Sequence, residues 1–119
     1  MMAPDLNRTL LAAIHRAVAE VMNAYASEKA GRRLEPLDWS IMPSSGELTG
    51  YVPVDCPEGD GEVAIVAAAW AWSLDLTLVP AGPGMAGSVT YAGAVEGRQV
   101  VIWGVTDRDV WDNGPGGAR

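Results

Sequence analysis

The stretch SVTYAGAVEGRQVVIWGV, residues 88–105, decides the fold because it carries the clearest β-hairpin pattern in the chain. Glu96-Gly97 suits a two-residue turn, in which glycine supplies a positive φ. Both faces of the hairpin are substantially apolar, so we expect it to be covered on both sides or to contribute to an interface. The turn predicts a register that pairs Val95 with Arg98, Gly93 with Val100, Tyr91 with Ile102 and Val89 with Gly104.

Three more strands are predicted upstream of this hairpin. Residues 37–42 alternate between apolar and polar side chains, the pattern of a half-buried strand, and residues 47–54 return after a turn-forming segment. A four-residue loop places Ile41 opposite Leu48 and Trp39 opposite Gly50, where the glycine leaves room for the indole ring. Residues 76–79 predict a short strand that ends at Pro80.

Two helices complete the predicted elements. Apolar residues recur at spacings of three and four over residues 6–30, so they form one stripe of an amphipathic helix that Gly31 terminates. Residues 61–74 are rich in alanine, which favours a second helix. This helix is apolar over more than half its circumference, so we expect it to be sandwiched or partly exposed to a partner.

The order of elements is therefore α-β-β-α-β-β-β, which predicts a single α+β domain over residues 1–112. We expect an antiparallel sheet with two helices packed on one face. The chain of 119 residues is long enough to bury one core without metal or disulfide support. Residues 113–119 show no pattern and are expected to be a disordered C-terminal tail.

The net charge of −7 is distributed unevenly along the chain. Residues 1–33 carry five basic and three acidic side chains, a net charge of +2, whereas residues 34–119 carry three basic and twelve acidic ones, a net charge of −9. No Lys or Arg occurs between residues 34 and 97. Nucleic acids bind through clustered Lys and Arg, so we expect no direct nucleic-acid binding and favour a partner protein with a basic or mixed surface.

A single cysteine excludes an internal disulfide and any zinc site built on several cysteines. The first residues lack the uninterrupted apolar stretch of a secretory signal. The longest apolar run, residues 63–72, falls well short of the roughly 20 residues that cross a bilayer. We expect a soluble, cytoplasmic protein that does not contact a membrane.

The densest group of carboxylates lies in DCPEGDGE, residues 55–62. Calcium loops need oxygen ligands at fixed offsets and glycine at the sixth position, but the sixth residue from Asp55 is Asp60. Asp60 instead suits the start of the second helix, and Glu58 and Glu62 complement its positive end. We expect no metal here, and we treat Asp55, Glu58, Asp60 and Glu62 as a candidate partner-binding surface.

Two patterns that suggest chemistry do not meet its requirements. Cys56 as a nucleophile would need a base, and nothing brings the single histidine, His15, close to it. The glycines of GPGMAG, residues 82–87, have a dinucleotide-binding spacing, but a strand rather than a helix follows them. We expect no catalytic residues, no cofactor and no enzymatic activity.

The five tryptophans supply the remaining information on function. Trp39 and Trp70 suit a core, whereas Trp72, Trp103 and Trp111 are hard to bury in one small core, and exposed aromatic residues mark protein interfaces. We therefore favour a small acidic binding protein that acts through protein-protein contact, as an inhibitor or an immunity or anti-defence accessory protein would. Two alternatives stay open: a structural protein that forms a homo-oligomer through the C-terminal hairpin, and a small-ligand-binding protein or enzyme with a pocket under residues 80–87.

Overall fold

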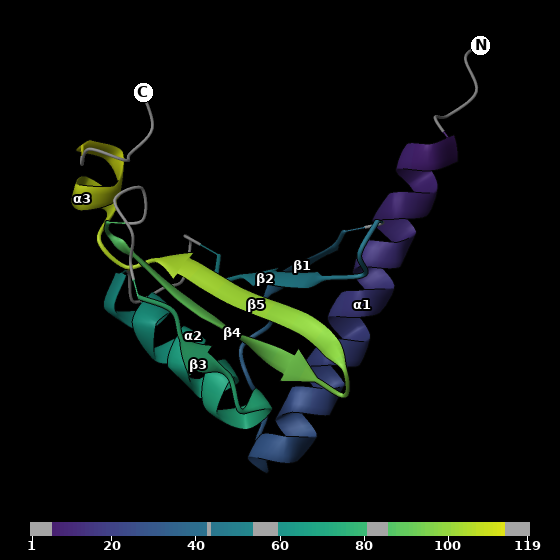
Figure 1. Ribbon diagram of the computed structural model, residues 1–119, viewed down its shortest axis with the longest axis horizontal. Helices are drawn as coiled ribbons and strands as arrows, with labels where there is room; N and C mark the ends of the chain where they lie inside the picture. The colour runs from purple at the N-terminus through teal and green to yellow at the C-terminus, as the bar shows by residue number, and fades with distance from the viewer. Residues whose placement is uncertain (1–5, 43, 54–59, 81–85, 114–119) are drawn as a thin grey trace.

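In the computed structural model, a five-stranded sheet with the strand order β1-β2-β5-β4-β3 forms the centre of one compact domain (Figure 1). The structure describes residues 6–42, 44–53, 60–80 and 86–113, and within these it leaves out the side chains at 60, 61, 108, 109 and 113. The elements are α1 (Leu6–Ala30), β1 (Asp38–Ile41), β2 (Leu48–Tyr51), α2 (Asp60–Leu74), β3 (Thr77–Leu78), β4 (Ser88–Val95), β5 (Arg98–Val105) and α3 (Arg108–Asn113).

The α+β class is confirmed, and the sheet differs from the expected wholly antiparallel one in a single pairing. β2 runs parallel to β5, with Leu48 opposite Val100 and Tyr51 opposite Trp103, so the sheet is mixed. The two hairpins are each antiparallel, as predicted. They join side by side through β2 and β5, a contact between strands distant in sequence that no local turn pattern specifies.

The register predicted for the C-terminal hairpin is confirmed at every pair, from Val95 opposite Arg98 to Val89 opposite Gly104. Glu96 and Gly97 both have positive φ, at 51° and 82°, which is the geometry of a type I′ turn. This turn type matches the right-handed twist of the strands, so the two turn residues fix the register of sixteen strand residues.

The first hairpin also has the predicted register, with Trp39 opposite Gly50 and Ile41 opposite Leu48. A Cβ atom at Gly50 would lie 2.9 Å from the Trp39 ring, so the glycine does make room for the indole. The strand expected at residues 76–79 is shorter in the structure, where β3 comprises Thr77 and Leu78. The Val79 amide still donates to the Thr90 carbonyl at 2.8 Å, so the pairing with β4 continues one residue further.

Both long helices pack on one face of the sheet, as expected, and the core lies between them and the strands. Gly104 of β5 shows how close α2 lies, since a Cβ atom there would come within 2.6 Å of Val63 Cγ1. The Trp70 indole nitrogen, fully buried, donates to the Glu35 carbonyl at 2.7 Å. The core contains Met22, Ala26, Leu34, Leu37, Trp39, Leu48, Val52, Val63, Val66, Ala67, Trp70, Leu74, Val100 and Ile102.

The first helix has the predicted bounds and ends as its sequence indicates. Gly31 has a φ of 72°, and its amide donates to the Glu28 carbonyl at 3.2 Å. The Arg32 amide donates to the Ser27 carbonyl, also at 3.2 Å. These two hydrogen bonds form a Schellman motif, which needs a left-handed residue after the helix and therefore favours glycine there.

A short helix, α3, follows β5 where the sequence shows no periodicity. The Asp107 carboxylate accepts a hydrogen bond from the Val110 amide at 3.1 Å and caps the helix. The Gly87 carbonyl accepts hydrogen bonds from the Thr106 and Asp107 amides at 2.8 and 3.1 Å, which fixes the approach to α3. Asn113 ends the helix, and residues 114–119 of the expected tail lie outside the described residues.

Candidate functional site

The acidic segment proposed from the sequence is only partly visible. Asp55 and Glu58 lie outside the described residues, and Asp60 begins α2 with its side chain left out. Glu62 is half-buried and lines a hollow of about 170 Å³ together with Arg32 and Arg33. The charge at the start of α2 is therefore mixed, because the segment that follows α1 brings two arginines beside it.

The most exposed aromatic residue of the described chain lies further along α2. Trp72 is 80% exposed and Ile65 is 64% exposed, and both lie on the side of the helix that faces away from the sheet. Ala68 lies between them and is also exposed. These three residues form one apolar stripe at helical spacing, and we refer to Ile65, Ala68 and Trp72 as the α2 outer face.

The other two candidate tryptophans lie on the opposite side of the sheet. Ile102 and Gly104 face the helices, so Trp103 between them points away. Its ring contacts Tyr51, with centroids 4.6 Å apart, and Trp111 of α3, with centroids 5.9 Å apart. Trp103 and Trp111 are half-buried in this stack and hold α3 against the sheet, so they cannot share a contact surface with Trp72.

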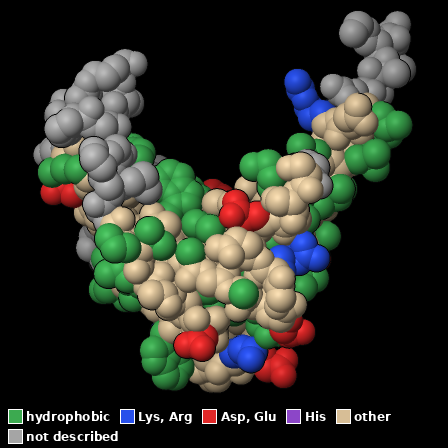
Figure 2. All heavy atoms as spheres, viewed as in Figure 1, with side chains coloured by type: hydrophobic (Ala, Val, Ile, Leu, Met, Phe, Trp, Pro, Cys, Tyr) green, Lys and Arg blue, Asp and Glu red, His purple; other side chains and the backbone are tan. Residues whose placement is uncertain are grey.

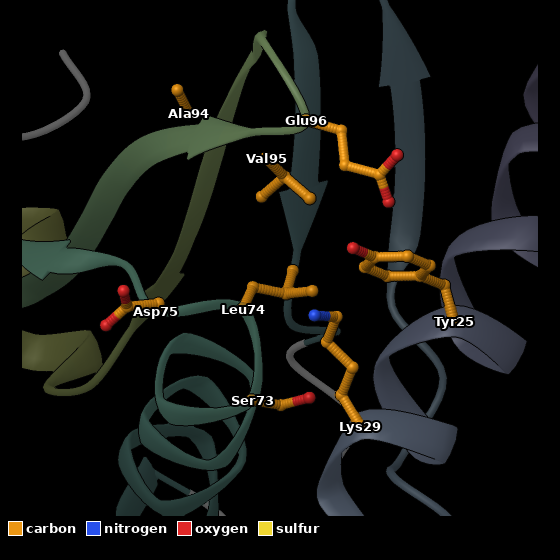
Figure 3. A pocket seen from close by; sticks show the side chains of 8 residues that line it. All are labelled: Tyr25, Lys29, Ser73, Leu74, Asp75, Ala94, Val95 and Glu96. Atoms are coloured by element: carbon orange, nitrogen blue, oxygen red, sulfur yellow. The ribbon is translucent and has the colours of Figure 1, made fainter.

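A small polar pocket of about 230 Å³ lies where α1, the end of α2 and the β4–β5 turn meet (Figure 3). The Glu96 carboxylate points toward the Tyr25 side chain, and the Lys29 amine lies 5.3 Å from the Tyr25 ring centroid. The Ser73 hydroxyl donates to the Ala26 carbonyl at 2.6 Å, so it links the two helices. The pocket is smaller than the roughly 300 Å³ of typical ligand sites.

The residues that the structure describes contain neither a metal-binding cluster nor a membrane-spanning helix. Within these ranges, no group of three or more His, Cys, Asp or Glu side chains could hold a metal ion. No helix in the same part of the chain has the length and apolar character needed to cross a bilayer. Cys56 lies outside the described residues, and so do residues 81–85, which make up most of the segment over the expected pocket.

An apolar surface that sequence reasoning missed lies on the first half of α1. Every residue from position 6 to position 14 is exposed, and this part of the helix extends past the strands (Figure 1). Hydrophobic side chains gather along it (Figure 2), with Leu6 68% and Leu10 51% exposed. We call residues 6–14 the α1 arm; its apolar periodicity was visible in the sequence, but its lack of cover was not.

Comparisons with known proteins leave the function to be argued from this geometry alone. No protein-family model, curated protein or solved structure matches the chain.

Proposed function

We propose that the protein is a small acidic binding protein that acts through contact with another protein and catalyses no reaction. The exposure of Trp72 on the α2 outer face carries this proposal. A tryptophan buries up to about 250 Å², and a few such aromatic anchors supply most of the binding energy in protein interfaces. Leaving this ring in water at the end of an apolar stripe is costly unless a partner covers it.

The rest of the α2 outer face suits an interface of this kind. Ile65 and Ala68 extend the apolar contact along the helix by about 10 Å, at 1.5 Å per residue. Few charged side chains would lose their hydration when this face binds a partner, since α2 holds no Lys or Arg. A short helix face with one large anchor matches the mode in which a helix fits an apolar groove of its partner.

The charge around the face supports a partner with a basic or mixed surface. Exposed Asp75 lies just beyond Trp72, while Glu62 and the two arginines lie near Ile65. A partner would therefore carry an apolar pocket for Trp72 with basic groups close by. An inhibitor or an immunity or anti-defence accessory protein, acting in the cytoplasm, fits this description.

The proposal is tested by parallel affinity capture from the native host with three baits: the wild type, Trp72→Ala and Val110→Ala. Val110 is an exposed apolar residue of α3 that does not belong to the α2 outer face, so its variant controls for a general loss of surface hydrophobicity. We expect a partner that the wild type and Val110→Ala retain and Trp72→Ala loses. With the purified partner, Trp72→Ala should weaken binding by roughly 30-fold or more.

Charge is tested separately by changing Glu58, Asp60 and Glu62 together to glutamine. If the acidic segment contributes, the association rate falls and its dependence on salt becomes weaker. A partner that binds the wild type and Trp72→Ala equally well would contradict the proposed face, and a set of captured proteins that is identical for all baits would contradict specific binding.

A further inference from the structure

The α1 arm is covered only slightly by the described part of its own chain. All nine of its residues are exposed, including Leu6, Leu10, Leu11 and Ile14. A helical segment of two to three turns has little intrinsic stability in water, and helices in proteins are held mainly by packing of an apolar face. The arm therefore presents an apolar helical surface that needs a partner.

The uncovered apolar surface continues along α1 beside the part that packs on the sheet. Leu6, Leu10, Ile14, Ala17 and Val21 are all exposed and recur at spacings of three and four. At 100° per residue this stripe lies roughly a third of a turn away from the stripe of Met22 and Ala26, which is buried in the core. We call these five exposed residues the α1 seam; their spacing is that of a helix-helix interface.

A groove runs beside the second half of the seam. Two hollows of about 350 and 220 Å³ share Val21, Met22, Leu48 and Arg98, so they adjoin each other along α1. The first extends to Ile14 and the second to Tyr25. The opposite wall comes from the ends of the strands and is mainly apolar, with Ile41, Leu48, Val95 and Val100.

We propose that a second copy of this chain occupies the groove, through antiparallel pairing of the two α1 helices. A two-fold axis beside residues 15 and 16 places Ile14 of each copy against Ala17 of the other, and Leu10 against Val21. Each arm then covers the seam of its partner and fills the partner's groove with Leu6 and Leu10. One rotation satisfies both copies, as in an isologous dimer.

Area favours a second copy as the occupant. The exposed side chains of the seam amount to on the order of 500 Å² per copy, so the pair buries on the order of 1,000 Å², the lower limit for a specific interface. The alanine at position 17 lets the helix axes approach closely at the centre, and the longer side chains of Leu10 and Val21 fill the flanks.

Charge favours the antiparallel direction of the two helices. The arm itself carries one charged side chain, Arg8, and the far end of the groove carries the Glu96 carboxylate, with Arg98 lining the groove between its two hollows. Antiparallel pairing brings the positive end of each helix dipole toward that carboxylate and toward Glu28. The α2 outer face contributes no residue to this groove, so the dimer stands or fails independently of the proposed function.

The test compares two Ala→Glu variants of the same helix by multi-angle light scattering between about 1 and 200 µM. Ala17 lies on the seam, and Ala12 lies on the arm but on the polar side; both are exposed. We expect the wild type and Ala12→Glu to form dimers with a dissociation constant on the order of 10 µM. Ala17→Glu enters the interface twice and should raise that constant by roughly 100-fold or more.

Circular dichroism of each variant at low concentration confirms that the fold is intact, which is expected because neither alanine is buried. A wild type that stays monomeric at about 200 µM would overturn the proposal and leave the groove to a different protein. Equal dimerisation of the wild type, Ala12→Glu and Ala17→Glu would overturn it as well, by moving the contact between copies away from α1.

Discussion

The two halves of α1 have similar sequence patterns and very different surroundings. The second half, residues 15–30, buries Met22 and Ala26 in the core and ends in a hydrogen-bonded Schellman motif at Gly31. The arm repeats the same spacing of apolar residues, yet all of its residues are exposed. The comparison teaches that amphipathic periodicity shows which side of a helix needs cover, whereas the fold decides whether the chain itself supplies it.

The largest effect on stability is expected from an Ala→Glu substitution in the second half of α1. Ala26 is fully buried, and its carbonyl accepts a hydrogen bond from the Ser73 hydroxyl. Ala26→Glu would bury a carboxylate with no partner and overfill the contact between α1 and α2, which should cost at least about 3 kcal/mol of the free energy of unfolding. Ala12→Glu should change that free energy by less than about 0.5 kcal/mol.

Urea denaturation of both variants at low protein concentration measures this difference directly. A loss of less than about 1 kcal/mol for Ala26→Glu would mean that the second half of α1 is not packed as described, and the contrast between the two halves would disappear.

Removal of an apolar side chain sharpens the same contrast. Met22→Ala takes a core side chain away from the sheet and should cost about 2–4 kcal/mol already in dilute solution. Leu10→Ala should change stability by less than about 0.5 kcal/mol in dilute solution, because the side chain is exposed there. In concentrated solution Leu10→Ala should lower the melting temperature relative to the wild type, because it removes part of the dimer contact.

Melting temperatures at about 2 and 200 µM separate these two cases. If Leu10→Ala and Met22→Ala were equally destabilising in dilute solution, the arm would be packed within the monomer, contrary to the structure.

The end of the covered half gives a smaller effect. Gly31 has a φ of 72°, and nothing lies within 4 Å of where its Cβ would be, so Gly31→Ala meets backbone strain alone. We expect a loss of about 1 kcal/mol. Gly31→Asn should recover much of it, because asparagine tolerates the left-handed region. Equal stability of the glycine and alanine proteins in urea would argue against the Schellman geometry at this end.

The sequence allowed local features of the fold to be predicted closely. Glu96-Gly97 determines a type I′ turn, and the pairing of Trp39 with Gly50 is a local fit of ring to glycine, so both hairpin registers follow from neighbouring residues. The parallel pairing of β2 with β5 was missed because its partners are far apart in sequence. The helix α3 was missed because six residues are too few for a period, and it depends on Asp107, Gly87 and the Trp103–Trp111 contact.

The candidate site was predicted less completely, again for reasons of distance in sequence. Trp72 was selected for its residue type, and its exposure agrees with that choice. Trp103 and Trp111 were selected for the same reason, but they stack with Tyr51 on the other side of the sheet. The arginines beside Glu62 come from the segment that follows α1, and only the packing of α1 against α2 brings them there.

Hydrogen exchange along α1, measured as a function of protein concentration, tests the central claim that a second copy covers the seam. The account predicts fast exchange of the arm amides at about 1 µM and roughly fivefold slower exchange of residues 10–17 at about 200 µM. The slowing should persist in Ala12→Glu and vanish in Ala17→Glu. Exchange in the arm that is independent of concentration in the wild type would contradict the account.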